Sequence, residues 1–343
     1  MRERRESLPG GKSPPRPVHG YGAPPSAGDT PATPPDPRPH QSAGFSGLVL
    51  LNKRPGVTSF QALNQVKKIF STGKVGHTGT LDKFASGLLV VLVGRAVKLS
   101  PWFLSCDKFY LAGIRFGLET ATLDPEGEVT AEAPVPCREA VEEALAKFRG
   151  DILQAPPAYS AIHINGVRSH ELARSGVPVE PEKRPVTIYA LELVSWEPPF
   201  AQIRVHCSKG TYIRSLARDL ALEAGSRAHL VTLERTGSAL FRLEDAVEPE
   251  NLNAGALKPI SPGIFQALRL PVLEADDETA AELVQGKALA PLLSRLRLSG
   301  GGKFPVSDTG ENAAAVFDRN ANFIAVLARE NGRWTYGYVY ARN

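Results

Sequence analysis

The amino-acid sequence predicts an α+β fold with a small β-rich module at its C-terminal end. Strand-like and helical patterns follow one another without regular alternation, which fits an α+β sheet better than a doubly wound parallel sheet. Hydrophobic residues make up 42% of the 343 residues, which is ample for two cores. The pattern changes after Pro271, where three short strand-like stretches lie close together.

The first predicted elements are a strand, a turn and a helix. Residues 47–51 have a strand pattern, and Lys-Arg-Pro-Gly at 53–56 predicts a turn. Thr58 or Ser59 can cap the helix that follows. Apolar residues recur along that helix at helical spacing, at Phe60, Leu63, Val66 and Ile69. Leucine and valine fill residues 88–93, a composition typical of a buried strand.

The middle of the chain mixes the two periodicities. Residues 109–116 alternate as a strand does, and residues 138–148 have a helical pattern. Residues 186–196 and 201–207 predict a hairpin, and residues 211–224 return to a helix.

The C-terminal module is predicted to contain one short helix and three strands. The helix, at 277–285, precedes a glycine-rich loop at 300–302. The strands follow at 313–318, 323–329 and 334–341. About 75 residues are at the low end of domain size, so we predict a separate module at 270–343 after a main domain at 44–269.

Residues 1–43 are predicted to be a disordered tail. They hold 11 of the 29 prolines and few large apolar side chains, so they cannot bury enough surface to offset the entropy of ordering. The alternative is a basic arm that contacts nucleic acid, built from Arg2, Arg4, Arg5, Lys12, Arg16 and Arg38. Four acids, Glu3, Glu6, Asp29 and Asp36, cancel most of that charge.

Composition excludes several classes of protein. The longest apolar run is too short to cross a bilayer, and the N-terminus lacks the apolar core of a signal peptide, so we expect a cytoplasmic protein with no membrane partner. The three cysteines are Cys106, Cys137 and Cys207. Their odd number and wide spacing, without a CxxC pair, argue against a disulfide framework and a zinc site. We predict no structural metal.

Charge is segregated along the chain although the net charge is only +4. Residues 53–108 contain nine Lys or Arg against two Asp and no Glu, a balance of +7. Residues 119–143 contain eight acids and one Arg, a balance of −7. A basic working face with an acidic flank would attract phosphate backbones; the alternative is an ordinary solvated face.

Asp82 is the first candidate functional residue. It lies in the stretch 76–87, where Gly76, Gly79 and Gly87 allow sharp turns or a close approach to a ligand. Two threonines in this stretch can hold the loop in shape with short hydrogen bonds. A loop beside a buried strand is a common place for chemistry. The alternative is an aspartate that caps a turn.

A second cluster lies at residues 207–216, where Gly210 separates a strand from a helix. If residues 211–213 are still extended, Tyr212 and Arg214 share one face. An arginine near a carboxylate lowers its pKa and keeps it ionised. The alternative is a core tyrosine followed by an arginine on a helix surface.

An ordered series of motifs spans roughly residues 45–245. It consists of Gly47-Leu48-Val49-Leu50-Leu51-Asn52-Lys53 with Gly56-Val57-Thr58-Ser59, Gly76-His77-Thr78-Gly79-Thr80-Leu81-Asp82 with Ala85-Ser86-Gly87, Asp107-Lys108-Phe109-Tyr110, Gly117 with Thr120 and Asp124, Pro156-Pro157-Ala158-Tyr159-Ser160-Ala161, and Cys207-Ser208-Lys209-Gly210-Thr211-Tyr212-Ile213-Arg214. In this order and spacing the series resembles the TruB-type tRNA pseudouridine synthases, and it is far more specific than any one motif.

The resemblance implies an isomerisation that needs neither a redox cofactor nor a metal. The bond between uracil N1 and ribose C1′ breaks, the base turns, and it is rejoined through C5. Asp82 would be the essential carboxylate, acting as a nucleophile or as a base that removes a ribose proton, with Arg214 as its guanidinium partner. The loop supplies one carboxylate, unlike the pair used by glycoside hydrolases.

The resemblance also implies a pocket for an extruded uracil. Tyr110 would stack on the base or handle its C5 proton, and Tyr212 and Leu233 would line the same pocket. His77 would help to replace the displaced base in the RNA loop, and Lys53 would support the pocket or a phosphate. Each also has an ordinary interpretation as a core, turn or solvated residue.

Three positions depart from the family's pattern. The family usually has Pro where this chain has Lys83, often Asp at Asn52, and commonly Arg at Glu234. Lys83 could loosen the turn beside Asp82 or raise the local positive charge, and Glu234 puts the pocket edge near Leu233 in doubt.

The implied architecture is a catalytic domain at 44–269 around a mixed, mostly antiparallel sheet, followed at 270–343 by a PUA-like RNA-binding module. The implied function is that of a stand-alone monomeric enzyme that binds the T-arm of tRNA, uses no guide RNA, and makes pseudouridine at position 55. The alternatives are a tRNA-binding folding helper, which would not need Asp82, and an aspartyl phosphotransferase, which would need a DxD signature or a metal cluster.

Overall fold

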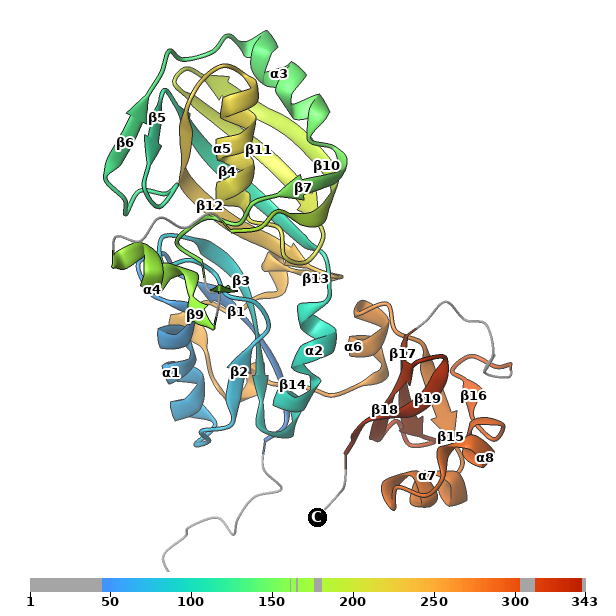
Figure 1. Cartoon of the computed structure of the whole chain (residues 1–343). Helices are drawn as coiled ribbons and strands as arrows, with labels where there is room; N and C mark the ends of the chain where they lie inside the picture. The colour runs from blue at the N-terminus through green and yellow to red at the C-terminus, as the bar shows by residue number, and fades with distance from the viewer. Residues whose placement is uncertain (1–44, 161, 165, 176–180, 303–311, 341–343) are drawn as a thin grey trace, which may run out of the picture. The chain divides into compact units, whose positions relative to one another are not determined.

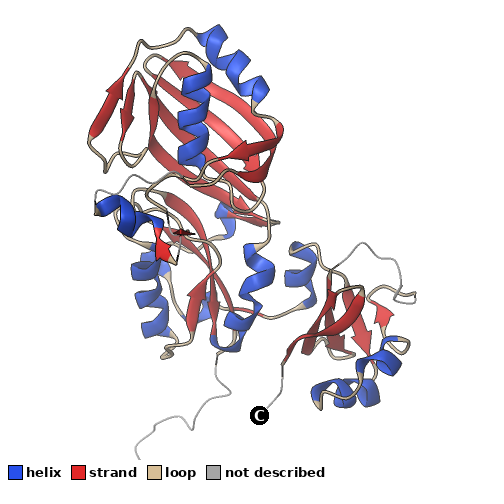
Figure 2. Cartoon of the chain, viewed as in Figure 1, coloured by secondary structure: helices blue, strands red, loops and turns tan. Residues whose placement is uncertain are grey.

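The computed structural model describes residues 45–160, 162–164, 166–175, 181–302 and 312–340. The predicted tail at 1–43, and with it the alternative of a basic arm, lies outside the described residues. Helices and strands are mixed throughout the described part, as the predicted α+β class requires (Figure 1, Figure 2).

Ten strands of the described residues form the main sheet. They are β1 (Gly47–Lys53), β2 (Val75–His77), β3 (Ser86–Val93), β4 (Lys108–Phe116), β7 (Gly150–Gln154), β10 (Arg184–Glu197), β11 (Phe200–Cys207), β12 (Ala228–Ser238), β13 (Phe241–Arg242) and β14 (Lys258–Pro259). Their order is β14-β1-β3-β12-β4-β11-β10-β7, with β2 beside β3 and β13 beside β12. Only β12 and β3 pair in parallel, so the predicted mixed, mostly antiparallel sheet is confirmed.

Helices and short strands connect these elements and cover the sheet. The helices are α1 (Ser59–Ile69), α2 (Ser100–Leu104), α3 (Arg138–Lys147), α4 (Ser169–Arg174), α5 (Ile213–Glu223) and α6 (Pro262–Ala267). Short 3-10 helices lie at η1 (Gly94–Leu99), η2 (Leu243–Asp245), η3 (Pro249–Asn251) and η4 (Ala254–Ala256). Two small hairpins are formed by β5 (Leu118–Thr120) with β6 (Val129–Glu132), and by β8 (His163–Ile164) with β9 (Val167–Arg168).

The main core lies between the sheet and the helices α1, α3 and α5. Alternate residues of β1 divide between two buried clusters, with Val49 and Leu51 in the main core and Leu48 and Leu50 in the other. The run at 88–93 is buried on both faces, which explains why it is continuously apolar. In Figure 1, α5 lies over the part of the sheet formed by β4, β11 and β12.

The first helix shows where its sequence pattern was informative and where it was not. Thr58 is the cap: its hydroxyl accepts a hydrogen bond from the Gln61 N–H at 3.1 Å, and the Gln61 side chain accepts one from the Thr58 N–H at 2.8 Å. Leu63 and Val66 are buried as predicted, but Phe60 is 64% exposed. Phe60 therefore does not belong to the buried face, and its ring instead lies under the Lys67 ammonium at 4.5 Å.

The C-terminal residues form a second sheet of five described strands. The strands are β15 (Val272–Ala275), β16 (Arg297–Leu298), β17 (Ala313–Asp318), β18 (Phe323–Glu330) and β19 (Arg333–Val339), in the order β16-β15-β17-β18-β19. The last three were predicted. Two helices, α7 (Asp277–Val284) and α8 (Leu289–Leu293), precede the glycine-rich loop, so the prediction of a single helix was wrong. The short segment at α8 carries too few residues to show a helical period. The domain bounds and the PUA-like character stay predictions.

Gly87 at the start of β3 is a position where only glycine fits. Its φ is +99°, and a Cβ there would lie 2.5 Å from the backbone oxygen of Arg235 on the parallel neighbour β12. We expect Gly87→Ala to lower the free energy of unfolding by about 2–4 kcal/mol, because it adds backbone strain to a clash between main chains. Urea unfolding would measure the loss. Gly73→Ala is the matched control: a Cβ at Gly73 meets nothing within 4 Å, so its effect should stay within about 1 kcal/mol.

Candidate active site

Asp82 lies in the loop between β2 and β3, and its neighbours on both sides are anchored. The Ser59 hydroxyl accepts a hydrogen bond from the Leu81 N–H at 2.8 Å and donates one to the Leu81 carbonyl at 2.9 Å. On the other side, the Lys83 carbonyl accepts a hydrogen bond from the Gly56 N–H at 2.8 Å. The Asp82 side chain therefore projects from a turn that is fixed at both ends.

Lys53 lies beneath this loop and supports it. Its side chain is fully buried, and its ammonium donates hydrogen bonds to the carbonyls of Arg54, Val57 and Lys83 at 3.0, 2.7 and 3.4 Å. Burial lowers the pKa of Lys53 to about 8, while the negative charge of Asp82 opposes that shift. Of its two predicted roles, the position fits support of the pocket, because the ammonium has no surface to offer to a phosphate.

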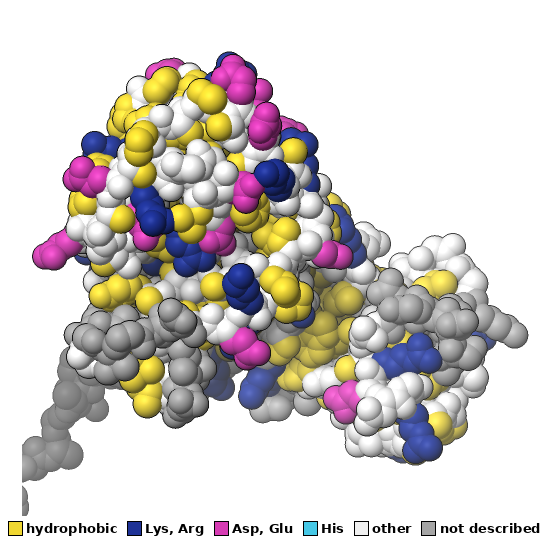
Figure 3. Space-filling view, turned by 45° about the horizontal axis from the view of Figure 1, so that its top comes forward, with side chains coloured by type: hydrophobic (Ala, Val, Ile, Leu, Met, Phe, Trp, Pro, Cys, Tyr) yellow, Lys and Arg dark blue, Asp and Glu magenta, His cyan; other side chains and the backbone are white. Residues whose placement is uncertain are grey.

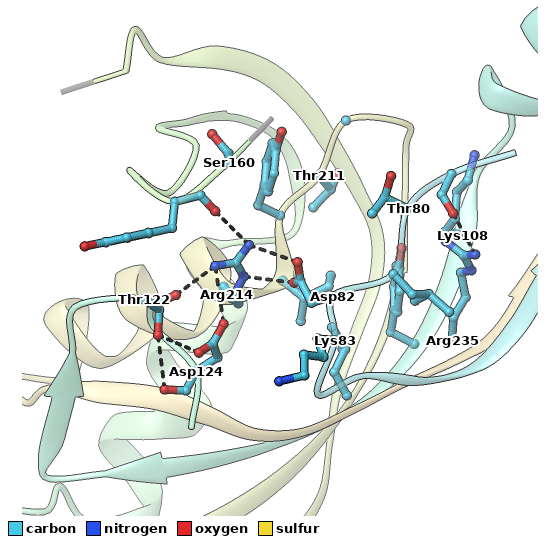
Figure 4. A pocket seen from close by; sticks show the side chains of 18 of the residues that line it. Thr80, Asp82, Lys83, Lys108, Thr122, Asp124, Ser160, Thr211, Arg214 and Arg235 are labelled. Carbon is cyan, nitrogen blue, oxygen red and sulfur yellow. Dashed lines mark hydrogen bonds and ion pairs between the residues drawn. The ribbon is translucent and has the colours of Figure 1, made fainter. Parts of the chain in front are cut away.

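Arg214 holds the Asp82 carboxylate with both arms of its guanidinium fork (Figure 4). Its Nε lies 2.9 Å from Oδ2 of Asp82, and its Nη2 lies 3.1 Å from Oδ1. The remaining donors are used as well: Nη1 bonds the Thr122 carbonyl at 2.8 Å and lies 3.4 Å from the Asp124 carboxylate, and Nη2 bonds the Tyr159 carbonyl at 3.1 Å. The guanidinium is buried and fully occupied, so it positions Asp82 rigidly.

The electrostatic balance at Asp82 differs from the prediction. Burial raises the pKa of Asp82, and Arg214 opposes this shift through its charge and its hydrogen bonds. Asp124 and, more weakly, Glu126 add to the rise, so the pKa of Asp82 lies above its usual value. The expected lowering by Arg214 is present, but desolvation outweighs it. The result is an aspartate that is more basic than an exposed one, which suits a nucleophile or a general base.

A cavity of about 570 Å³ opens over Asp82. Five of the predicted site residues line it: Asp82, Tyr110, Tyr212, Arg214 and Leu233. They come from the β2–β3 loop, β4, the start of α5 and β12, so elements distant in sequence converge on one site. The helix α5 begins at Ile213, so residues 211–213 are not all extended as supposed. Tyr212 and Arg214 nevertheless line the same cavity.

Two of the three tyrosines that line the cavity, Tyr110 and Tyr212, are held as neutral phenols. Burial raises the pKa of Tyr110 and of Tyr212, and nearby arginines only partly offset it. The backbone of Tyr212 exchanges two hydrogen bonds with the Gln154 side chain, at 2.8 Å from its N–H and 3.1 Å to its carbonyl. Both rings are thus available for stacking and as hydrogen-bond donors.

His77 is not brought into the cavity lining. It lies on β2 and is partly buried, and burial followed by the charge of Arg235 lowers its pKa. Its Nδ1 is buried without a hydrogen-bond partner among the described residues. His77 and Lys53 thus lie outside the cavity lining, with Lys53 beneath the Asp82 loop.

Asp124 and Arg235 line the cavity, but the sequence did not predict them as site residues. Asp124 is part of a motif of the resemblance to which no role was assigned. Arg235 is buried and bonds the carbonyls of Leu88 and Gly79 at 2.7 and 3.1 Å, so it ties the Asp82 loop to β3. The period of two along β12 could have found Arg235, because it places residues 233 and 235 on one face. Glu234 does not line the cavity.

Comparison with known proteins identifies the family. Residues 67–213 match the model of the N-terminal domain of TruB family pseudouridylate synthase. A protein named tRNA pseudouridine synthase B from Borreliella burgdorferi (strain ZS7) is 47% identical over 215 residues, which cover 62% of this chain and 76% of that protein. The protein of the same name from Francisella tularensis subsp. novicida (strain U112) is 47% identical over 211 residues, 61% of this chain and 70% of that protein. The chain belongs to the TruB family.

The TruB-family fold is also shared with solved structures at low sequence identity. One, described as a Cbf5-Nop10-Gar1 complex, is 23% identical with a TM-score of 0.63 and covers 88% of this chain and 84% of that chain. The predicted family, α+β pseudouridine synthase fold and isomerase activity are therefore confirmed. Among the described residues of this TruB-family chain, no helix is long and apolar enough to cross a membrane.

Proposed function

We propose that this TruB-family enzyme converts uridine 55 in the T-loop of tRNA to pseudouridine, with Asp82 as its catalytic residue. The observation that carries the proposal is the Asp82 carboxylate held by the Arg214 fork at a cavity about 570 Å³ in volume. The names of the relatives, tRNA pseudouridine synthase B, support tRNA as the substrate. We further propose a free-standing, cytoplasmic, monomeric enzyme that needs no guide RNA, metal or cofactor.

The reaction balances without an outside reactant. Asp82 either attacks the nucleoside or removes a ribose proton, and the N1–C1′ bond breaks with its electron pair leaving on the base. The uracil then turns, a C5–C1′ bond forms, the hydrogen at C5 leaves as a proton, and N1 takes up a proton. Asp82 is regenerated when its bond to the nucleoside breaks or, on the other route, when it returns the proton to the ribose, and the product has the same atoms as the uridine. Both routes need an ionised carboxylate, and its raised basicity serves either one.

The cavity walls suit a base that has left its stack. Tyr110 and Tyr212 are neutral rings that can stack on an extruded uracil, and Leu233 adds an apolar surface. His77, outside the cavity lining, keeps its proposed role toward the space that the base leaves in the RNA. A folding helper that only binds tRNA would not need a half-buried carboxylate held by an arginine, so the enzyme is the better-supported interpretation.

The direct test of this function uses a T-arm hairpin with tritium at C5 of its uridines. Because the new bond forms at C5, each turnover should release one tritium to water. The same hairpin with cytidine at position 55 should release none. Equal release from both hairpins would place the reaction at another uridine, and no release from either would remove the proposed activity.

RNA affinity should depend strongly on salt. Of the nine basic residues in 53–108, Lys53 and Lys108 are buried, so the solvent-facing charge of the segment is smaller than the predicted +7. Figure 3 shows basic and acidic side chains interleaved on the face in view. We still expect affinity for the T-arm hairpin to fall about tenfold or more between about 50 and about 200 mM salt, through release of counterions. Filter binding would measure it, and salt-independent binding would contradict phosphate recognition.

A further inference from the structure

Three acids, Asp82, Asp124 and Glu126, line the active-site cavity together with four cations. A nucleotide that swings out of an RNA loop brings its flanking phosphates with it, since they are covalently attached to its ribose. An exposed cation of the lining can attract such a phosphate, whereas the acids repel it.

Three of the four cations that line the cavity cannot take that role. Lys108, Arg214 and Arg235 are 7%, 5% and 2% exposed, respectively. Their donors are already used: Lys108 bonds the carbonyls of Leu104 and Cys106, and the two arginines hold the contacts described above. Breaking such buried bonds to bind a phosphate would leave unpaired acceptors behind.

Lys83 differs from these three in both respects. Four lysines and arginines line the cavity, and all four belong to the described residues. Of these, Lys83 alone is exposed, with 53% of its side chain accessible. The backbone carbonyl of Lys83 accepts hydrogen bonds from the Gly56 N–H and the Lys53 ammonium, so the Lys83 backbone is fixed beside Asp82. In Figure 4 the Lys83 side chain extends toward the Asp124 side of the cavity.

The contact that Lys83 makes is easy to exchange. Its ammonium lies 3.5 Å from Oε1 of Glu126, which is 47% exposed and sits in the loop between β5 and β6. Exposed pairs of this kind contribute about 0–1 kcal/mol. A phosphate oxygen at hydrogen-bonding distance would give the same ammonium a charge-assisted bond, and little free energy is lost when the 3.5 Å pair with Glu126 is broken.

We propose that Lys83 binds a backbone phosphate of the RNA next to the flipped uridine, and that Glu126 occupies the lysine until the RNA displaces it. Binding exchanges one carboxylate for one phosphate on the same ammonium, and no covalent bond changes. Lys83 is thus a substrate-binding residue beside Asp82, and Glu126 competes with the RNA for its ammonium. The inference rests on the proposed function, because it takes RNA as the substrate.

The test measures KM and kcat for tritium release from the T-arm hairpin at several salt concentrations. Lys83→Gln should raise KM about 3–10-fold, leave kcat within about twofold, and reduce the slope of log KM against log salt by about 1. Lys83→Arg should restore the slope, because it keeps the charge. Glu126→Gln should lower KM, because the lysine is no longer occupied by a carboxylate.

Lys147 and Glu223 provide the matched control. They form an exposed ion pair of the same type, with an N–O distance of 2.5 Å, and neither lines the cavity. Lys147→Gln and Glu223→Gln should leave KM, kcat and the salt slope unchanged. A Lys83→Gln enzyme with the wild-type salt slope, or with a loss confined to kcat, would overturn the inference. The proposed function is judged separately, by tritium release from the wild-type enzyme with the hairpins that carry uridine or cytidine at position 55.

Discussion

Replacing Asp82 with Asn is expected to reduce pseudouridine formation by at least about 10⁴-fold, which is the scale of loss when a catalytic group is removed. The amide keeps the shape of the side chain and can still contact Arg214, but it can neither attack the nucleoside nor accept a proton. The affinity for RNA should stay within about threefold of the wild-type value, because the substitution leaves the tyrosines and exposed lysines that would contact the RNA unchanged. Tritium release under single turnover and filter binding would measure the two effects.

Asp219→Asn is the control for this variant. Asp219 also pairs with an arginine, Arg218, at 2.8 Å, but it does not line the cavity. Its substitution should leave both activity and affinity near the wild-type values. Pseudouridine formation retained in the Asp82→Asn enzyme would exclude the carboxylate as the catalytic group, whatever the RNA affinity.

Replacing Arg214 with Gln is expected to lower kcat by about 10²-fold or more, which is the scale of loss when a reacting group is misplaced by about 1 Å. The change removes two contacts to Asp82 and leaves that carboxylate close to the negative charges of Asp124 and Glu126. Without the guanidinium, which opposes the upward shift, the pKa of Asp82 must rise further.

The direction of the shift in the pH profile follows from the pKa of Asp82. Activity needs the ionised form of Asp82, so activity is lost as the pH falls through the pKa of that group. In the wild-type enzyme this acid limb should lie above the pH at which an ordinary aspartate titrates, because the pKa of Asp82 is raised. In Arg214→Gln the limb should move to still higher pH, and part of the lost activity should return as the pH is raised.

Arg218→Gln is the control that distinguishes loss of the Arg214 contact with Asp82 from loss of any arginine of α5. Arg218 lies one turn further along α5 and bonds Asp219 and the Ala155 carbonyl, away from the cavity lining. The dependence of kcat on pH in the Arg218→Gln enzyme should match that of the wild type. An Arg214→Gln enzyme with reduced kcat and an unmoved acid limb would mean that Arg214 acts on folding rather than on Asp82.

Local patterns predicted most elements of the fold because those elements are defined by their own residues. The apolar run of β3, the capping box at Thr58 and the alternation in β4 each needed only neighbouring positions. Phe60 shows the limit of this approach: the helical period was right, but the width of the buried face depends on what packs against it. The short α8 likewise had no period to display.

The site could be predicted where a motif names a residue, but not where distant contacts give it its properties. Asp82 stands out in sequence, whereas its contact with Arg214 joins positions 132 residues apart. The burial that raises the pKa of Asp82, and the burial of Lys53 and Lys108 inside a segment that looks basic, come from packing of the whole domain. Charge counted along a sequence therefore overstates charge on a surface.

The central claim is that one carboxylate in this cavity isomerises one uridine of tRNA. Incubation of the full chain with unmodified tRNA, followed by mapping of pseudouridine at nucleotide resolution, tests it most directly. We predict a single new pseudouridine at position 55 with the wild-type enzyme and none with Asp82→Asn in the parallel reaction. Pseudouridine at another position, or at position 55 with both proteins, would contradict the account.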